Sequence, residues 1–220
     1  MIGAFREAGV IGSVIRGLRS DDWNVLVVDD GSDDETAERA TEAGAVVLRH
    51  RVNLGQGAAL RTGFKYLLET GAAGYIVTFD ADGQHRPEDI APMLEPLANG
   101  GADVVLGSRF LRPEDTHSMP PLRRAVLRLA ARVARRSTGL ALTDTHNGLR
   151  AFTRDALSRL ELQQDRMAHA SEIQTEIARL GLRCMETPVR VSYTQYSMAK
   201  GQRLTGAVSI LWDLLVAKMR

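Results

Sequence analysis

The sequence lacks the features that define several large protein classes. It has a single cysteine, Cys184, among 220 residues, so it can form no internal disulfide, and we expect a reducing cytoplasm as its environment. No window reaches the roughly 18 apolar residues that cross a bilayer, and no basic start with an apolar run marks a secretory signal. Repeats and low-complexity segments are also missing. The formal net charge of +1 does not indicate nucleic acid, and we expect no such partner.

The chain also lacks the glycine pattern of dinucleotide-binding proteins. Residues 53–57 read Asn-Leu-Gly-Gln-Gly, but Leu60 occupies the third glycine position of G-x-G-x-x-G, which disfavours an NAD-dependent oxidoreductase. The N-terminus has no Gly-rich loop with Arg and Lys, which disfavours a sugar-1-phosphate nucleotidylyltransferase. Gly57 could still place backbone N–H groups near an anion, and a tight turn is the competing explanation.

What is present is an alternation of short apolar runs and helical patterns in a chain of ordinary composition, 44% hydrophobic and 25% charged. Strands are predicted over 25–28, 45–48, 75–79, 103–106 and 185–191. Helices are predicted over 33–43, 57–70, 120–136 and 204–219, with a further one starting at Pro87. This alternation predicts an α/β fold with a mostly parallel central sheet flanked by helices.

Acidic residues follow two of the predicted strands. Asp29 and Asp30 follow the first, and Asp80 and Asp82 follow the third. In parallel sheets ligands bind at the carboxyl ends of the strands, so we expect these acids to share one site. Asp80 and Asp82 have the oxygen ligands that Mg²⁺ and Mn²⁺ prefer, with Gln84 as an accessory ligand, and a solvated turn is the competing interpretation.

The first acidic pair has two interpretations that are compatible. Asp29 and Asp30 could accept hydrogen bonds from a nucleotide base and ribose. Ser32 or Asp33 would then cap the helix that follows.

The second half of the chain is rich in arginine. The helix over 120–136 has an apolar face of Val126, Leu129, Ala130, Val133 and Ala134. A basic stripe of Arg124, Arg128, Arg132 and Arg135 lies beside it and could bind phosphate or an anionic membrane surface, unless it is simply solvated. His146 and His169 are candidate proton-transfer groups.

Taken in order, the motifs resemble the family 2 inverting glycosyltransferases, especially the dolichol-phosphate mannosyltransferase-like branch. The matching segments are 4–7 (Ala-Phe-Arg-Glu), 27–34 (Val-Val-Asp-Asp-Gly-Ser-Asp-Asp), 53–57, 79–85 (Phe-Asp-Ala-Asp-Gly-Gln-His), 107–109 (Gly-Ser-Arg) and 144–150 (Asp-Thr-His-Asn-Gly-Leu-Arg), with Glu172 and Lys200. The resemblance covers nearly the whole chain.

The resemblance implies a GT-A type nucleotide-diphospho-sugar transferase fold in a single domain, with a nucleotide-sugar half over 1–110 and an acceptor half over 111–220 that ends in an amphipathic helix. It implies a hexose donor linked to UDP or GDP, Mg²⁺ or Mn²⁺, inversion at the anomeric carbon, and a polyprenyl phosphate acceptor at the cytoplasmic face of the membrane. The implied nucleotide-sugar-binding residues are Ala4, Phe5, Glu7, Asp29, Asp30, Gly57, Asp80 and Ala81. The implied metal ligands are Asp80, Asp82 and Gln84. The implied catalytic residues are Asp82, Arg109 and Arg123, and the acceptor side adds Asp144, Arg150, Glu172 and Lys200.

The chain departs from the family pattern at two positions. Arg6 replaces the usual Asn, and Thr194 replaces an Arg, for which Arg203 is a candidate substitute. If the acceptor were instead a sugar hydroxyl in a surface polysaccharide, His146, His169 or Glu172 would have to be the base. A non-catalytic nucleotide-sugar binding module is a further alternative, against which the intact Asp80, Asp82 and Gln84 argue.

The two ends of the chain carry their own expectations. The helix over 204–219 is too short to span a bilayer, so it would lie in the interface, pack in the core or form a homodimer. The chain begins in what looks like a strand missing its first residues, and we expect its true start to lie upstream of Met1.

Overall fold

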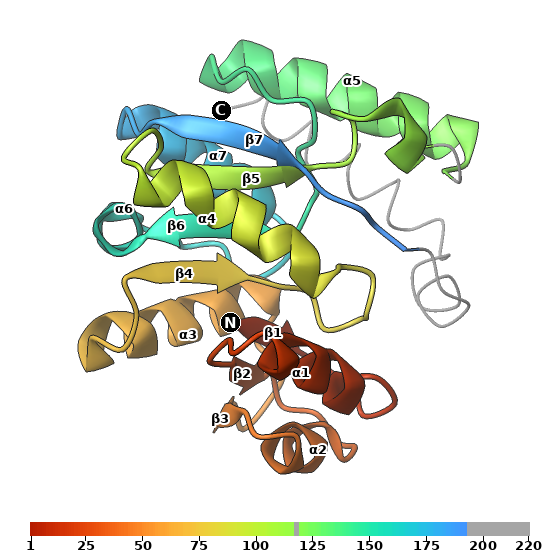
Figure 1. The fold of residues 1–220 in the computed structure, drawn as a ribbon, viewed down its shortest axis with the longest axis vertical. Helices are drawn as coiled ribbons and strands as arrows, with labels where there is room; N and C mark the ends of the chain where they lie inside the picture. The colour runs from red at the N-terminus through yellow and green to blue at the C-terminus, as the bar shows by residue number, and fades with distance from the viewer. Residues whose placement is uncertain (117–118, 193–220) are drawn as a thin grey trace.

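The computed structural model describes residues 1–116 and 119–192, arranged as a twisted sheet with helices on both faces (Figure 1). The predictions for Thr194, Lys200, Arg203 and the helix over 204–219 lie outside these residues. The structure confirms the α/β fold with a mostly parallel sheet that the sequence predicted.

The strands form two hydrogen-bonded ladders. The first is parallel, in the order β1-β2-β3, and the second has the order β4-β6-β5-β7, in which only β6 runs antiparallel to its neighbours. The strands are β1 (Ile2–Ala4), β2 (Leu26–Asp29), β3 (Val46–Arg49), β4 (Tyr75–Thr78), β5 (Val104–Ser108), β6 (Arg150–Thr153) and β7 (Cys184–Pro188).

The main chain of Met1 joins the two ladders. Its amino group donates to the Val77 carbonyl at 2.7 Å, and its carbonyl accepts from the Phe79 N–H at 3.0 Å. Met1 therefore bonds to the residues on either side of Thr78, which is the hydrogen-bond pattern of parallel strands. The strand order across the molecule is therefore β3-β2-β1-β4-β6-β5-β7, and the carboxyl ends of β1, β2 and β4 lie together.

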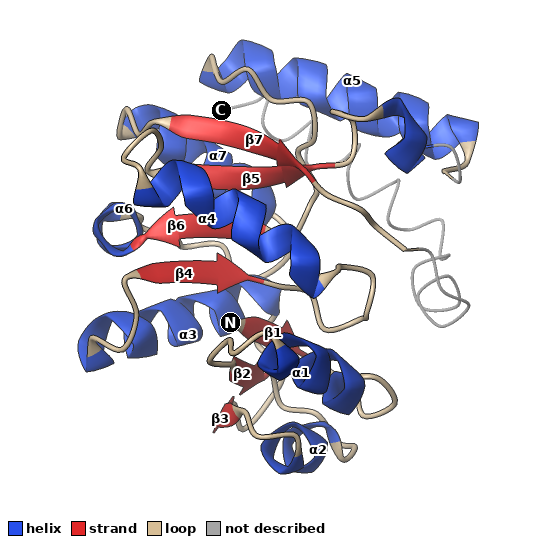
Figure 2. Cartoon of the chain, in the orientation of Figure 1, coloured by secondary structure: helices blue, strands red, loops and turns tan. Residues whose placement is uncertain are grey.

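The helices cover the sheet in two layers (Figure 2). They are α1 (Ile11–Ser20), α2 (Thr36–Glu42), α3 (Gln56–Thr70), α4 (Ile90–Ala98), α5 (Pro121–Thr138), α6 (Arg154–Arg159) and α7 (His169–Arg179), with short 3-10 turns η1 (Pro87–Asp89) and η2 (Pro113–Thr116). One core contains the apolar faces of α1 and α4, and the other contains those of α3, α6 and α7. Each core is built on alternate faces of the strands, which explains why β2 and β5 are buried on both sides.

Three predicted details were wrong. Helix α2 begins at Thr36 rather than Asp33, because Asp34 accepts the Thr36 N–H (3.1 Å) and Ser32 bonds to Asp29. In α5 the buried residues are Leu127, Ala130 and Ala131, whereas the predicted core residue Leu129 is 49% exposed. Strand β6 was not predicted, because its residues Arg-Ala-Phe-Thr form no continuous apolar run, unlike those of the equally short β2.

Among the described residues, none of the helices has both the length and the apolar character that a membrane span requires.

Candidate active site

A cavity of about 420 Å³ opens at the carboxyl ends of β1, β2 and β4. It is lined by Gly3, Ala4, Phe5, Glu7, Asp30, Asn53, Gly55, Gln56, Ala59, Asp80, Ala81, Asp82, Arg166 and Met167. Seven residues that the sequence analysis assigned to nucleotide sugar or metal thus lie around one cavity: Ala4, Phe5, Glu7, Asp30, Asp80, Ala81 and Asp82. Part of the wall, Arg166 and Met167, comes from the second half of the chain.

Asp80 follows β4 and is held in a tight setting. The His85 Nε2 atom lies 3.0 Å from its Oδ2 atom, and the backbone at Gly148 passes so close that a Cβ there would lie 2.2 Å from both carboxylate oxygens. Burial would raise the pKa of Asp80, but the hydrogen bond from His85 and the nearby positive charge of Arg150 keep that pKa below its usual value. Asp80 is therefore an anion whose side chain remains 31% exposed.

Asp82 lies on the same cavity and carries an opposing shift. Its Oδ1 atom accepts the Gln84 N–H at 3.0 Å, across a turn in which Gly83 has a φ of +72°. Burial and the charge of Asp80 raise the pKa of Asp82. The two carboxylates repel each other in one cavity, and a divalent cation bound between them would relieve that repulsion.

The oxygen atoms of Asp80 and Asp82 suit a hard cation that takes phosphate and water as further ligands. Among the described residues, no group of three or more His, Cys, Asp or Glu side chains is placed to hold a metal. Two carboxylates, with the Gln84 side chain nearby in sequence, match the sparse protein coordination typical of Mg²⁺ at phosphate-binding sites.

The carboxylates of the first acidic pair, Asp29 and Asp30, are both bonded within the protein. Asp29 is fully buried, accepts from the Ser32 hydroxyl, pairs with Arg49 at 3.1 Å and does not line the cavity. Asp30 lines the cavity, but the protein itself saturates its carboxylate. The groups bonded to it are His50 Nδ1 (2.7 Å), Asn53 Nδ2 (2.9 Å), Leu54 N (3.0 Å) and Gly55 N (2.7 Å). Both acids thus shape the loops around the cavity, and of the two only Asp30 lines it, so that contact of Asp30 with a nucleotide stays a prediction.

Gly57 also differs from prediction, because it lies outside the cavity. A Cβ at Gly57 would lie 2.0 Å from the Gln164 carbonyl oxygen, and one at Gly55 would lie 2.3 Å from that of Asp165. Gly55 also has a φ of +109°, which favours glycine. These glycines let the segment before α7 lie directly on the start of α3.

Arg109 was predicted to bind an acceptor phosphate, but its guanidinium is engaged inside the protein. Its Nε and NH2 atoms donate to the two carboxylate oxygens of Asp144 at 2.6 and 2.8 Å, and NH2 also donates to the His146 carbonyl. The two side chains are 6% and 0% exposed. In this structure Arg109 and Asp144 therefore position the loop that carries His146. Arg123 belongs to α5, and its side chain is not described.

Glu172 was predicted on the acceptor side, but it serves a loop. Its carboxylate accepts the N–H groups of Gln163 (2.8 Å) and Gln164 (3.0 Å) and does not line the cavity.

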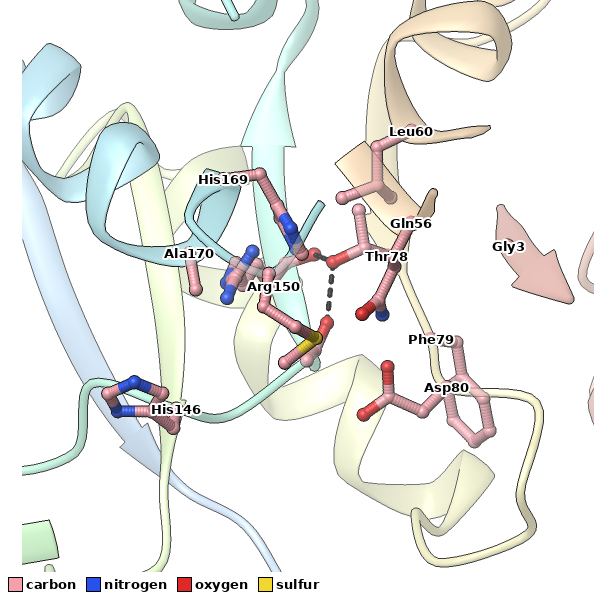
Figure 3. Close-up of a pocket in the computed structure, with 12 residues that line it drawn as sticks. Gly3, Gln56, Leu60, Thr78, Phe79, Asp80, His146, Arg150, His169 and Ala170 are labelled. Atoms are coloured by element: carbon pink, nitrogen blue, oxygen red, sulfur yellow. Dashed lines mark hydrogen bonds between the residues drawn. The ribbon is translucent and has the colours of Figure 1, made fainter. Parts of the chain in front are cut away.

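A second, smaller pocket of about 90 Å³ adjoins the first (Figure 3). It shares Gly3, Gln56, Asp80 and Met167 with the larger cavity. Figure 3 shows Arg150, His146 and His169 on the side contributed by the second half of the chain. Burial lowers the pKa of His146 and that of His169 to about 4 each, so both rings are neutral at pH 7.

Several residues of this site escaped the sequence analysis. His85, Gly148, Asn53, Arg166 and Met167 were not assigned roles. His85 and Asn53 stand inside motifs that were recognised, so their proximity to Asp80 and Asp30 was a usable signal. Nothing in the local sequence around Arg166 and Met167 indicates that they face a cavity formed by residues 3–82.

Comparison with known proteins supports this picture. The glycosyl transferase family 2 model matches residues 1–161. The chain is 33% identical over 239 residues to the UDP-N-acetylglucosamine–dolichyl-phosphate N-acetylglucosaminyltransferase of Methanococcus voltae, covering 100% of this chain and 95% of that one. It is 34% identical to the undecaprenyl-phosphate mannosyltransferase of Micrococcus luteus over 174 residues, 76% of this chain and 70% of that one.

A solved structure shares the fold. Glucosyl-3-phosphoglycerate synthase from Mycobacterium tuberculosis, in complex with Mn²⁺, UDP-glucose and phosphoglyceric acid, has a TM-score of 0.67 and 23% identity, covering 98% of this chain and 77% of that one. Fold, acidic pair and relatives together define a glycosyltransferase. The chain belongs to glycosyl transferase family 2, in its dolichol-phosphate glycosyltransferase-like branch.

Proposed function

We propose that this protein is a divalent-metal-dependent, inverting transferase that moves a hexose from a UDP- or GDP-sugar to a polyprenyl phosphate. The observation that carries the proposal is that Asp80 and Asp82 share one cavity with Ala4, Phe5 and Glu7. In that arrangement Ala4, Phe5, Glu7 and Ala81 contact the nucleotide sugar.

Asp80, Asp82 and Gln84 would hold Mg²⁺ or Mn²⁺. When bound, such a cation neutralises the diphosphate and so stabilises it as a leaving group. The chain's own contribution is positional. His85 orients Asp80, the Gln84 N–H orients Asp82, and Asp30 fixes the loop that forms the opposite wall.

The acid–base character of the second pocket favours a phosphate acceptor. A sugar hydroxyl needs a base whose pKa lies near the working pH, whereas an ionised phosphate attacks without one. His146 and His169, each with a pKa lowered to about 4 by burial, are poor bases at pH 7, and Glu172 is tied to backbone N–H groups. Relatives named for dolichyl-phosphate and undecaprenyl-phosphate support the same acceptor class.

Helix α5 supports contact with a membrane surface on its cytoplasmic side. It exposes Leu122 (74%) and Leu129 (49%) beside the exposed side chains of Arg128 and Arg132. Apolar groups flanked by arginines suit the interface of an anionic bilayer. Sedimentation with vesicles containing anionic lipid would test this, and failure of Leu122→Ser/Leu129→Ser to weaken binding would argue against it.

The test of the proposed reaction is release of nucleoside diphosphate from a panel of UDP- and GDP-sugars. Each donor is supplied with Mg²⁺ or Mn²⁺, with and without a short polyprenyl phosphate. Release that requires both metal and lipid phosphate is the expected result. Metal-dependent release without stimulation by the lipid would favour transfer to a hydroxyl, and no release from any donor would favour a binding module.

The matched variant for this assay is Asp82→Asn, which keeps the size of the side chain and removes its charge. We expect turnover to fall by at least about 100-fold while the melting temperature stays within a few degrees. Full activity in Asp82→Asn would remove Asp82 from the proposed metal site.

A further inference from the structure

The guanidinium of Arg150 is buried and has no hydrogen-bonding or ion-pair partner among the residues that the structure describes. It opens β6, opposite Thr78 of β4 and Leu106 of β5, and the residue is only 5% exposed. Within residues 1–116 and 119–192, no hydrogen bond or ion pair joins its guanidinium to another side chain or carbonyl group. Buried cations are normally paired, because an unpaired one loses its hydration without compensation.

The guanidinium lines the smaller pocket, where it is the permanent positive charge. His146 and His169 share the pocket and are neutral at pH 7, and their pKa values are lowered by burial and by Arg150 itself. Burial lowers the pKa of Arg150, and the nearby negative charges of Asp80, which lines the same pocket, and of Asp144 oppose that shift. Asp144 is already bound by Arg109, so its field holds the charge on Arg150 without occupying its N–H groups.

We propose that this pocket is an oxyanion subsite, in which Arg150 binds a phosphate or carboxylate group of a substrate. The proposal rests on the proposed function, because it places the anion on the acceptor or on the transferred sugar. A guanidinium suits such a group because its planar fork matches two oxygens at once. His169 is oriented to assist. Its Nδ1 atom faces the Arg166 carbonyl at 2.8 Å and must donate to it, which leaves Nε2 as an acceptor for a protonated oxygen.

The position of the pocket suits a reacting group. It shares Asp80 with the cavity proposed for the nucleotide sugar, so an anion on Arg150 would lie near the proposed metal ligand Asp80. Its volume of about 90 Å³ admits one small group and excludes a nucleotide. Arg109, which the sequence nominated for a phosphate, is bound to Asp144 instead.

The first test is equilibrium binding and needs no turnover. Inorganic phosphate is titrated into the protein with Mg²⁺ at constant ionic strength, and affinity is followed by calorimetry. We expect Arg150→Gln to weaken phosphate binding by about 10- to 100-fold, as loss of a charged hydrogen-bonding partner does, and Arg150→Lys to weaken it less. Equal affinity in wild type and Arg150→Gln would overturn the proposal, as would failure of the wild type to bind phosphate.

The control is Arg179→Gln, which removes an exposed arginine from α7, far from the pocket lining. It should leave phosphate affinity unchanged. Thermal unfolding separates binding from a structural role. Replacing an arginine that stabilises the fold lowers the melting temperature. Because Arg150 is buried and unpaired, Arg150→Gln should instead leave the melting temperature unchanged or raise it.

The second test identifies the source of the oxyanion in the transfer assay. A rise in the KM for polyprenyl phosphate in Arg150→Gln, with the donor KM unchanged, would place the acceptor phosphate there. A rise in the donor KM that is confined to sugars with a carboxylate would place the carboxylate of the donor sugar at Arg150. A fall in kcat with both KM values unchanged would overturn the proposal, and because phosphate binding is measured separately, an inactive enzyme would not be mistaken for a failed subsite.

Discussion

Arg109 and Asp144 form a two-pronged ion pair that is almost closed to solvent, with N–O distances of 2.6 and 2.8 Å and side chains 6% and 0% exposed. Burial would raise the pKa of Asp144, but the charge and hydrogen bonds of Arg109 keep it lowered. The pair links the end of β5 to the loop before β6, and so positions the loop that carries His146.

The first prediction concerns this pair. Asp144→Ala leaves the Arg109 charge buried without its partner, and we expect the free energy of unfolding to fall by roughly 3–5 kcal/mol. Replacing both residues, Arg109→Met with Asp144→Leu, should recover most of that loss. Urea unfolding of the two variants measures the difference, and a loss below about 1 kcal/mol in Asp144→Ala would show that the pair does not hold this loop.

The second prediction uses the contact between Gly148 and Asp80. Gly148→Ala places a methyl group where both carboxylate oxygens of Asp80 now lie, so the carboxylate must move. A displacement of about 1 Å at a reacting site costs roughly 100-fold in rate, and we expect a loss of that size in nucleoside diphosphate release. Gly74→Ala is the matched control, since nothing lies within 4 Å of its added Cβ. Activity of Gly148→Ala equal to that of Gly74→Ala would contradict this geometry.

The third prediction is a pH dependence of stability. His169 is 3% exposed, and burial lowers its pKa from 6.5 to about 4 in the folded protein. Between these values the unfolded chain binds more protons, so stability falls as pH drops from 6.5 towards 4, by on the order of 3 kcal/mol from this residue. His169→Gln should show a shallower loss in urea unfolding over that range. Parallel pH profiles for the two proteins would mean that His169 is not buried as a neutral ring.

The fourth prediction concerns Arg6, which has a φ of +56° beside the cavity residue Phe5. Asn tolerates this conformation better than Arg, whereas the ion pair of Arg6 with Asp33 is exposed and contributes little. We expect Arg6→Asn to raise the free energy of unfolding by up to about 1 kcal/mol. Arg6→Ala removes the same ion pair without easing the backbone, so it should not share the gain, and equal stability of the two variants would refute this explanation.

The sequence indicated the position of Asp80 and Asp82 at the cavity, but not the pairing of Arg109 with Asp144, for a physical reason. Asp80 and Asp82 follow a strand whose end must lie at the ligand edge of a parallel sheet, so a local pattern located them. Arg109 and Asp144 are 35 residues apart in the sequence, and only the folded chain shows that they form an ion pair with each other. The same limit applies to Asp30, because its partners at 50–55 lie in the loop after β3.

Strand β6 illustrates a second limit. Its four residues, Arg-Ala-Phe-Thr, form no continuous apolar run, and its direction reverses within an otherwise parallel sheet. Because β6 carries Arg150, missing the strand also meant missing that Arg150 lies between β4 and β5.

The segment before α7 lies on Gly55 and Gly57 and supplies Arg166 and Met167 to the larger cavity. Residues that follow the region matched by the family model, which ends at residue 161, therefore complete the wall of this cavity. As a consequence, the two halves of this enzyme are not interchangeable modules. A chimera that joined residues 1–161 to the remainder of a relative would therefore change the lining of the larger cavity as well as the segment that follows it.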